Sequence, residues 1–211
     1  DSRLEVGARC VIREYVTLNS GTARGDGVTL IGGDCMFMAG SHVGHDGRVG
    51  ERVVLANYAS LGGHAEVGDD VFVGAYAGVH QFVRVGRRAA IAAMAPVRRD
   101  VLPFTLCEAE GLGGLNLVGL RRADFGRERI RALQRALDWI FGAEGTLAAR
   151  LERVGVELGH VDAVAVMLDF ARAASARGLT ALPASGSRAS GVLAHPAAQL
   201  LDDLGVDLAD P

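Results

Sequence analysis

The chain has 211 residues, of which 49% are hydrophobic, and its formal net charge is −3. A net charge this small argues against nucleic acid as a partner, because nucleic-acid-binding domains carry a marked excess of basic side chains. No apolar run approaches the about 20 residues of a membrane span and no signal peptide is visible, so we expect a cytoplasmic protein of one or two domains.

The first predicted element, residues 1–104, is a repeat of six residues. From Ile31 to Val97 an aliphatic residue, or Phe37 in its place, occupies every sixth position, and a small residue usually follows it. A strict period of six fits neither an α-helix nor a strand of a sandwich. The pattern predicts a parallel β-helix in which each hexad supplies one short strand and one corner. Three hexads then form a triangular coil, so that residues eighteen apart stack on neighbouring coils.

The beginning of the repeat is interrupted by a predicted loop at residues 21–30. Val6 begins a first hexad series that reaches Leu18, but the thirteen residues from Leu18 to Ile31 are one more than two hexads. Loops of a solenoid often form its binding face. The chain opens at Asp1 inside the repeat, so we expect a fragment that lacks earlier coils and is poorly soluble or inactive alone, because its end is open.

The second half of the chain is predicted to change from strands to helices. Pro103 ends the repeat, since it cannot donate to a strand ladder. Residues 105–122 form a glycine-rich connector, of which we expect Glu108 to Leu120 to be irregular. Residues 123–177 have apolar side chains at helical spacing and form a helical domain, followed by a flexible tail at residues 178–211. The predicted helices cover 127–141, 147–158 (capped by Thr146) and 161–176.

Histidines cluster within the repeat, at outward or corner positions of their hexads. They are His42, His45, His64 and His80. A single histidine there is most often just solvated, but Asp46 follows His45 and could orient its ring. A neutral imidazole near pH 7 is the commonest general base. Zinc is the rival ligand of such a cluster, but separations of 19 and 16 residues do not match the stacking period, and we predict no metal.

Arginines are concentrated where acidic residues are absent, between Val71 and Arg99. This strip is either an ordinary solvated surface or a docking surface for an acidic or phosphate-bearing partner. Its members are Arg84, Arg87, Arg88, Arg98 and Arg99. Farther along, the adjacent Arg121 and Arg122 could grip a diphosphate.

Four segments together, SHVGHD, LGGHAEVGDD, VHQFVRVG and NLVGLRRADF, resemble the bacterial UDP-N-acetylglucosamine O-acyltransferases over about residues 3–177. The resemblance implies a homotrimer of left-handed parallel β-helices, each followed by a small helical domain, with active sites between subunits. The implied reaction is the first step of lipid A synthesis. It moves a 3-hydroxyacyl chain from acyl carrier protein to the 3-hydroxyl of UDP-N-acetylglucosamine and needs no cofactor, since the carrier thioester is a substrate.

The resemblance also implies residue roles. His45 would be the general base, Asp46 would orient it, and the backbone N–H of Gly63 would stabilise the oxyanion. The implied pocket for the sugar nucleotide is formed by His42, His64, His80 and Gln81, with Asn116, Arg121 and Arg122 reaching in from a neighbouring segment. Ala93 and Met94 would lie at the floor of the acyl groove, where their side chains favour a shorter chain. The arginine strip would fit the acidic carrier protein.

Departures from the family pattern leave alternatives open. Val118 stands where the family usually has an acidic residue, and the family's first coils and a nucleotide-binding loop would precede Asp1. The sugar is therefore either N-acetylglucosamine or a 3-amino analogue. The rival functions are the later N-acyltransferase of the same pathway, a non-catalytic trimeric scaffold and a metal-dependent hydratase.

Overall fold

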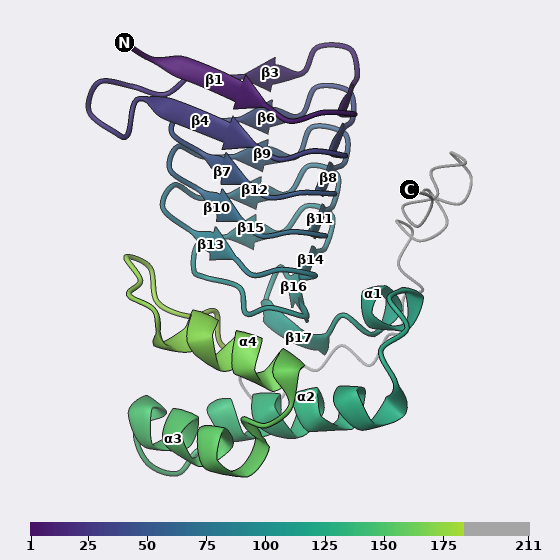
Figure 1. The fold of residues 1–211 in the computed structure, drawn as a ribbon, viewed down its shortest axis with the longest axis vertical. Coiled ribbons are helices and arrows are strands. Elements are labelled where there is room, and N and C mark those ends of the chain that lie inside the picture. The colour runs from purple at the N-terminus through teal and green to yellow at the C-terminus, as the bar shows by residue number, and fades with distance from the viewer. Residues whose placement is uncertain (184–211) are drawn as a thin grey trace.

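The computed structural model describes residues 1–183, which form a three-sided column of short strands closed at one end by helices (Figure 1). Strands β1 to β15 follow one another down the column, and the helices come after them in chain order (Figure 1). The predicted flexible tail falls mostly on residues 184–211, which lie outside the described residues.

Three sheets, one for each side of the column, contain all the strands. Sheet one has β1 (Arg3–Val6), β4 (Val28–Ile31), β7 (Arg48–Val49), β10 (Glu66–Val67) and β13 (Arg84–Val85). Sheet two has β2 (Val11–Ile12), β5 (Met36–Phe37), β8 (Val54–Leu55), β11 (Phe72–Val73), β14 (Ala90–Ile91), β16 (Thr105–Glu108) and β17 (Gly111–Leu115). Sheet three has β3 (Thr17–Leu18), β6 (His42–Val43), β9 (Ser60–Leu61), β12 (Gly78–Val79) and β15 (Pro96–Val97).

Parallel pairing between coils confirms the predicted repeat. Val49 pairs with Val67 and then Val85, which sets successive coils eighteen residues apart. The first coil is offset by twenty-five residues instead, since Val6 pairs with Ile31. The extra residues form the predicted loop, but 21–30 is too long for it: β4 begins at Val28, where the chain can already donate to the ladder. The loop thus ends at residue 27.

The first residue of each hexad points into the column and forms its core. Phe37, Leu55 and Ile91 have no exposed surface. The same position is more open in the first coil, where Val6 and Ile12 are 41% and 48% exposed because residues 1–183 contain no coil on that side of them. Each coil therefore buries its apolar face against the coils beside it.

The fourth residue of each hexad turns the corner between sheets in the left-handed backbone region. A residue other than glycine loses about 1 kcal/mol in this conformation, so the ladders on either side must impose it. The fourth positions stack into three corners. The charge corner, between sheets one and two, is Arg9, Asp34, Arg52, Asp70 and Arg88; the tyrosine corner, between sheets two and three, is Tyr15, Gly40, Tyr58, Tyr76 and Met94; the site corner, between sheets three and one, is Asp46, His64 and Phe82.

Within the connector at residues 105–122, the glycine content led us to expect irregular structure from Glu108 to Leu120, but this segment forms a strand and the start of a helix. β16 continues sheet two in parallel beside β14, and β17 folds back on β16 as an antiparallel hairpin. Leu112 and Leu115 of β17 are buried and cover the end of the core. The prediction was wrong because these buried leucines, not the intervening glycines, decide the structure.

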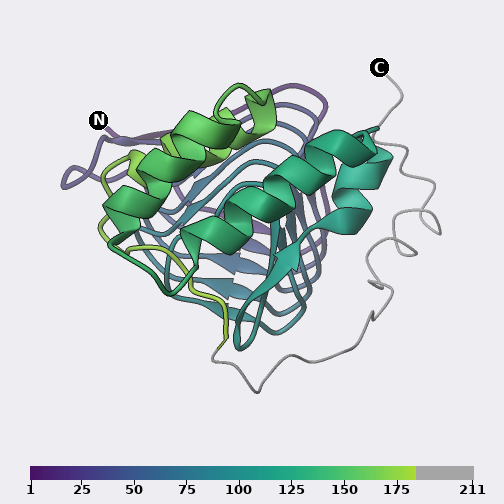
Figure 2. The same ribbon diagram turned by 90° about the horizontal axis from the view of Figure 1, so that it is seen from below.

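Four helices follow the hairpin and cover the lower end of the column (Figure 2). They are α1 (Leu117–Arg122), α2 (Arg127–Ile140), α3 (Leu147–Leu158) and α4 (Asp162–Arg172). The predicted helices correspond to the last three, with the cap at Thr146 confirmed by a 3.2 Å bond from the Ala149 N–H to its hydroxyl. Leu133, Val154 and Met167 are fully buried between these helices. Among the described residues no helix is both long and apolar enough to cross a membrane.

After α4 the chain returns to the column rather than continuing as a helix to residue 176. Residues 173–183, the return segment, run beside the lower coils (Figure 1). The amide of Asp100 donates to the Gly178 carbonyl at 2.8 Å, and the amide of Thr180 donates to the Asp100 carbonyl at 2.7 Å. The first residues of the predicted tail are thus hydrogen-bonded to the β-helix.

Candidate functional site

The site corner brings together residues from three successive coils. The turns after β6, β9 and β12 carry His45 with Asp46, Gly63 with His64, and Gln81 with Phe82, respectively. Because the coils are in register, the fourth-position side chains lie above one another. The repeat alone therefore brings residues that are eighteen positions apart into contact.

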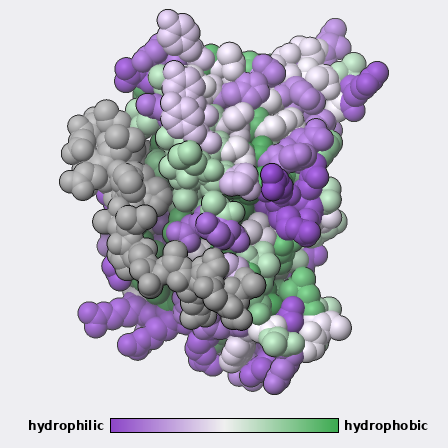
Figure 3. Space-filling model, turned by 180° about the vertical axis from the view of Figure 1, so that it is seen from behind, coloured by the Kyte–Doolittle hydropathy of each residue, from purple (hydrophilic) through white to green (hydrophobic). Residues whose placement is uncertain are grey.

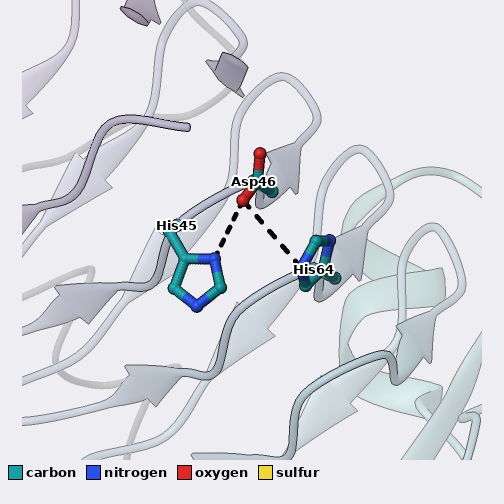
Figure 4. Close-up of side chains that lie close together, drawn as sticks. All are labelled: His45, Asp46 and His64. Atoms are coloured by element: carbon teal, nitrogen blue, oxygen red, sulfur yellow. Dashed lines mark hydrogen bonds and ion pairs between the residues drawn. The ribbon is translucent and has the colours of Figure 1, made fainter. Parts of the chain in front are cut away.

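His45 and Asp46 form a hydrogen-bonded pair. The Nδ1 atom of His45 lies 2.9 Å from Oδ2 of Asp46, and the Asp46 side chain is 1% exposed whereas that of His45 is 43% exposed (Figure 4). An ionised carboxylate only accepts hydrogen bonds, so it selects the tautomer with the proton on Nδ1. The Nε2 atom of His45 is thereby left as an acceptor, which a general base requires.

Thr22, in the loop before β4, holds the carboxylate and was not predicted. Its amide donates to both Asp46 oxygens, at 3.0 and 3.2 Å, and its hydroxyl donates to Oδ2 at 2.8 Å. Burial alone would raise the pKa of the Asp46 carboxyl. The bonds from the Thr22 amide, His45 and the Thr22 hydroxyl outweigh burial and hold this pKa well below its usual range.

Gly25 of the same loop leaves room for Asp46. A Cβ atom at this position would lie 2.4 Å from the Asp46 Cγ atom, closer than any van der Waals contact allows. The loop is also tied to β7 by an ion pair of 2.6 Å between Asp26 and Arg48. The loop predicted to be part of a binding face thus forms the support of the carboxylate.

Gly63 lies directly against the His45 ring. A Cβ atom on Gly63 would be 2.7 Å from Nε2 of His45, so glycine is needed for the ring to occupy its position. The Gly63 N–H is at a third hexad position, where the turn removes it from the strand ladder. Within the described part of the chain it donates to no protein acceptor. It is therefore available to a ligand beside His45.

His64 lies between the His45–Asp46 pair and an aromatic ring. Its Nε2 atom is 3.9 Å from Oδ2 of Asp46, and its ring meets the edge of His45 with centroids 5.2 Å apart. On the other side it stacks on Phe82 at 4.6 Å, a contact the sequence reasoning missed. A pocket of about 230 Å³ opens here, and Ala174 and Ala176 of the return segment form part of its wall.

The other two histidines flank this cluster on sheet three. The Nδ1 atom of His42 lies 2.8 Å from the Thr17 hydroxyl. His80 is exposed and lies two coils below His42. Its Nδ1 atom is 2.8 Å from the guanidinium of Arg177, and the same arginine reaches the carbonyl of Gln81.

Asn116, Arg121 and Arg122 are not brought to the histidines within one chain. The Asn116 side chain caps α1 by accepting from the Gly119 amide at 3.1 Å and donates to the Arg88 carbonyl at 3.0 Å. This places it at the charge corner, across the column from His45. Arg121 and Arg122 follow in α1.

Two arginines of the strip form ion pairs with carboxylates of the same chain. Arg84 is 2.8 Å from the buried carboxylate of Asp100 and its side chain is only 15% exposed. Arg88 is 3.2 Å from Asp70. The remaining members, Arg87, Arg98 and Arg99, form no ion pair with a carboxylate of residues 1–183 and keep the strip cationic.

Ala93 and Met94 lie at the end of the tyrosine corner, away from His45. Met94 is 76% exposed, so a single chain does not enclose an acyl groove here. Tyr58 and Tyr76 above it stack at 5.1 Å and are also more than half exposed. Seen from behind, apolar side chains gather in the middle of the molecule between polar groups (Figure 3).

His45, Asp46 and His64 are the group of side chains, among the described residues, that could hold a metal ion. Their ligand atoms lie within 4.8 Å of one another. The Oδ2 atom of Asp46, however, already accepts from both Thr22 and His45, so a metal would have to displace these donors. The contacts fit an oriented base better than a metal centre.

Comparison with known proteins identifies the family. Residues 100–180 match the model of domain 2 of UDP-N-acetylglucosamine O-acyltransferase. The acyl-(acyl-carrier-protein)–UDP-N-acetylglucosamine O-acyltransferase of Paracoccus denitrificans is 56% identical over 135 residues, which are 63% of this chain and 52% of that protein. The chain thus spans about half the length of that relative.

Two further matches extend over more of the chain. The enzyme of the same name from Rhizobium etli is 40% identical over 190 residues, 89% of this chain and 70% of that protein. The structure of a UDP-N-acetylglucosamine acyltransferase from Campylobacter jejuni superposes with a TM-score of 0.79 at 37% identity, covering 86% of this chain and 71% of that one. Because identity of this level runs through both the β-helix and the helices, the chain belongs to the UDP-N-acetylglucosamine O-acyltransferase family.

Proposed function

We propose that this protein transfers a 3-hydroxyacyl chain from acyl carrier protein to the 3-hydroxyl of UDP-N-acetylglucosamine, in the cytoplasm and as the first step of lipid A synthesis. The observation that carries the proposal is the oriented His45–Asp46 pair beside the amide of Gly63, which has no acceptor among residues 1–183. Base and oxyanion donor are the two groups that acyl transfer from a thioester requires. The names of the relatives supply the substrates.

The reaction needs one proton transfer in each direction. Nε2 of His45 takes the proton of the sugar hydroxyl as the oxygen attacks the thioester carbon. Asp46 stabilises the imidazolium that forms, because its carboxylate accepts a hydrogen bond from Nδ1–H, with 2.9 Å between Nδ1 and Oδ2. The Gly63 amide donates to the carbonyl oxygen as that oxygen becomes negative. When the C–S bond breaks, His45 returns the proton to the leaving thiolate, and the products are the ester and the carrier thiol.

The complete site is proposed to need a second copy of the chain, in a homotrimer. Asn116, Arg121 and Arg122 are assigned to the sugar and diphosphate, yet Asn116 is held at a different corner from His45. A neighbouring copy that packs its charge corner and α1 beside the site corner would bring them together. His42, His64, His80 and Gln81 would supply the remaining contacts to the sugar nucleotide.

The same packing bears on the two ends of the acyl donor. A neighbouring copy would enclose Ala93 and Met94, whose side chains would limit the acyl groove to a shorter chain. Arg87, Arg98 and Arg99 are the members of the strip best placed to attract acyl carrier protein, since Arg84 and Arg88 are already paired with carboxylates.

The test follows thiol release from 3-hydroxyacyl carrier protein with and without UDP-N-acetylglucosamine, for the native enzyme and His45→Ala. We expect sugar-dependent release that falls by about 10²- to 10⁴-fold in the variant, the range of a general base. His160→Ala, at an exposed position in the turn after α3, is the matched control and should be unaffected. Release that requires the 3-amino sugar would instead identify the amino analogue as acceptor. No release at several acyl lengths would favour a scaffold.

A further inference from the structure

We propose that Arg177 of the return segment is a positioning residue, which fixes His80 in the tautomer that donates from Nε2 to an acceptor oxygen of the sugar nucleotide. The inference rests on the proposed function for the identity of the ligand. The contact between Arg177 and His80 stands independently of that function. It joins residues 97 positions apart in the sequence.

The guanidinium of Arg177 contacts two groups of the predicted sugar-nucleotide pocket. Its Nη2 atom is 2.8 Å from Nδ1 of His80, and its Nε atom donates to the Gln81 carbonyl at 3.0 Å. Two bonds from one planar group fix its orientation as well as its distance. The arginine is thus held against the turn that presents both residues.

The chemistry of arginine decides the state of the histidine. A guanidinium has five N–H donors, no acceptor, and keeps its proton at any physiological pH. Nδ1 of His80 also lies 3.3 Å from the Gln81 carbonyl, to which it could only donate. Toward the guanidinium, at 2.8 Å, it can only accept, and the Gln81 carbonyl already accepts from Nε of Arg177. The shorter contact therefore makes Nδ1 the acceptor and places the ring proton on Nε2. This is the opposite tautomer to that of His45, whose Nδ1 donates to Asp46. One histidine of the site takes a proton and the other offers one.

The return segment is built to keep Arg177 in place. The hydroxyl of Ser175 accepts from the Arg177 amide at 3.0 Å and from the Gly178 amide at 2.7 Å. Gly178 has a φ of 68°, which lets the chain turn at once to its bond with Asp100. Asp100 is 1% exposed and is itself held by Arg84. The segment that carries Arg177 is therefore held in place by its hydrogen bonds to the buried Asp100.

A fixed donor at His80 restricts what it can bind. Nε2–H pairs with a hydroxyl, carbonyl or phosphate oxygen, and the charge of Arg177 beside it favours oxygens that carry negative charge. A sugar diphosphate offers such oxygens. The segment that carries Arg177 also borders, through Ala174 and Ala176, the pocket beside His64 and Phe82.

The experiment combines nitrogen-15 NMR of the histidine rings with steady-state kinetics on the native enzyme, Arg177→Met and Arg177→Lys. Met keeps the length and removes every donor, whereas Lys restores one. Arg131→Gln, on the exposed face of α2, is the control. We expect the Nε2–H signal of His80 in the native enzyme, a mixture of tautomers in Arg177→Met, and partial recovery in Arg177→Lys.

The kinetic expectation is specific to the acceptor sugar. KM for UDP-N-acetylglucosamine should rise about 5- to 10-fold in Arg177→Met, the value of one positioned hydrogen bond, with kcat within about twofold. An unchanged His80 tautomer in Arg177→Met, or a loss of kcat with unchanged KM, would overturn the proposal. If the native enzyme transfers no acyl chain, the proposed function fails, while the NMR comparison still decides whether Arg177 sets the tautomer.

Discussion

Two corners of the same β-helix use one backbone for opposite purposes. Asp34 and Asp70 at the charge corner and Asp46 at the site corner have φ values between 57° and 59°. At the charge corner the stacked side chains alternate in sign, and Asp70 is paired with Arg52 at 2.7 Å and Arg88 at 3.2 Å. Each charged side chain there lies next to a side chain of opposite charge in a neighbouring coil.

The stacked side chains of the site corner do not alternate in charge. Its stack passes from a carboxylate through an imidazole to a phenyl ring, and the carboxylate is satisfied by a loop instead of by the next coil. The amides differ in the same way: that of Glu51 donates to Asp69 at 3.0 Å, whereas that of Gly63 remains unpaired within the described residues. The repeat thus supplies geometry at every corner, and side-chain identity at one corner supplies the chemistry.

The largest effect should come from Asp46→Asn, which should leave His45 of the site corner less able to act as a base. All three hydrogen-bond partners of the carboxylate, the Thr22 amide, the Thr22 hydroxyl and His45, are donors. Asn offers one acceptor oxygen, so its amide group would face a donor or select the wrong tautomer of His45. We expect kcat to fall by about 10²- to 10⁴-fold, as when a base loses its orienting carboxylate.

The measurement is steady-state acyl transfer together with thermal unfolding. A KM for the sugar close to the native value would show that the pocket persists. A kcat within threefold of the native enzyme would mean that Asp46 does not set the tautomer of His45.

Gly25→Ala should disturb the same carboxylate from outside. The new methyl group would lie 2.4 Å from Cγ of Asp46, so either the loop or the carboxylate must move. Displacement of a catalytic group by about 1 Å costs up to about 100-fold in rate, and we expect a loss of about 10- to 100-fold. Gly126→Ala, where no atom lies within 4 Å of a Cβ, is the matched control. Equal activity of the two variants would contradict the role of the loop.

The fold could be predicted because the repeat fixes the direction of every side chain. A first-position residue such as Leu55 must point inward, so the period alone gave the core and the stacking. The hairpin at β16 and β17 was missed because glycines such as Gly113 and Gly114 obscure the alternation of buried residues around them. Composition was a weaker guide there than burial.

The site could be predicted only where the repeat itself assembles it. Asp46 and His64 are eighteen residues apart and meet through the stacking period, whereas Arg177 meets His80 only through the fold of the helical domain. Thr22 lies between these cases. The offset of the first coil places the loop beside Asp46, so the loop's length was a usable signal for that contact.

At the charge corner, Asp70→Asn should affect stability and leave catalysis unchanged. Asn tolerates the left-handed backbone, so the substitution removes mainly the charge shared by Arg52 and Arg88. We expect a loss of about 1 kcal/mol in the free energy of unfolding, with kcat within twofold. Urea unfolding should show this difference shrinking at high salt, where surface charges are screened. A catalytic defect would show instead that the charge corner influences the site corner.

The two corners should also differ in how salt affects their carboxylates. The pKa of Asp34 is lowered by its bond to the Arg9 guanidinium, and its side chain is 35% exposed. The pKa of Asp46 is lowered, against the effect of burial, by the uncharged donors of Thr22 and by His45. A lowered folded pKa means that each carboxylate stabilises the fold above the unfolded pKa of about 3.9 and loses this stabilisation as the pH falls through the folded value.

High salt screens an exposed ion pair but not a buried hydrogen bond to a neutral group. Carboxyl carbon-13 NMR between pH 2 and 6 (about the range in which unperturbed carboxyls titrate) should therefore show the Asp34 titration moving upward in high salt. Asp46, whose pKa is held well below this usual range, should show no upward movement of its titration. A parallel upward movement of Asp46 would mean that charged neighbours, not the Thr22 loop, keep it ionised. In that case the site corner would be a variant of the charge corner, and the loop would have no catalytic role.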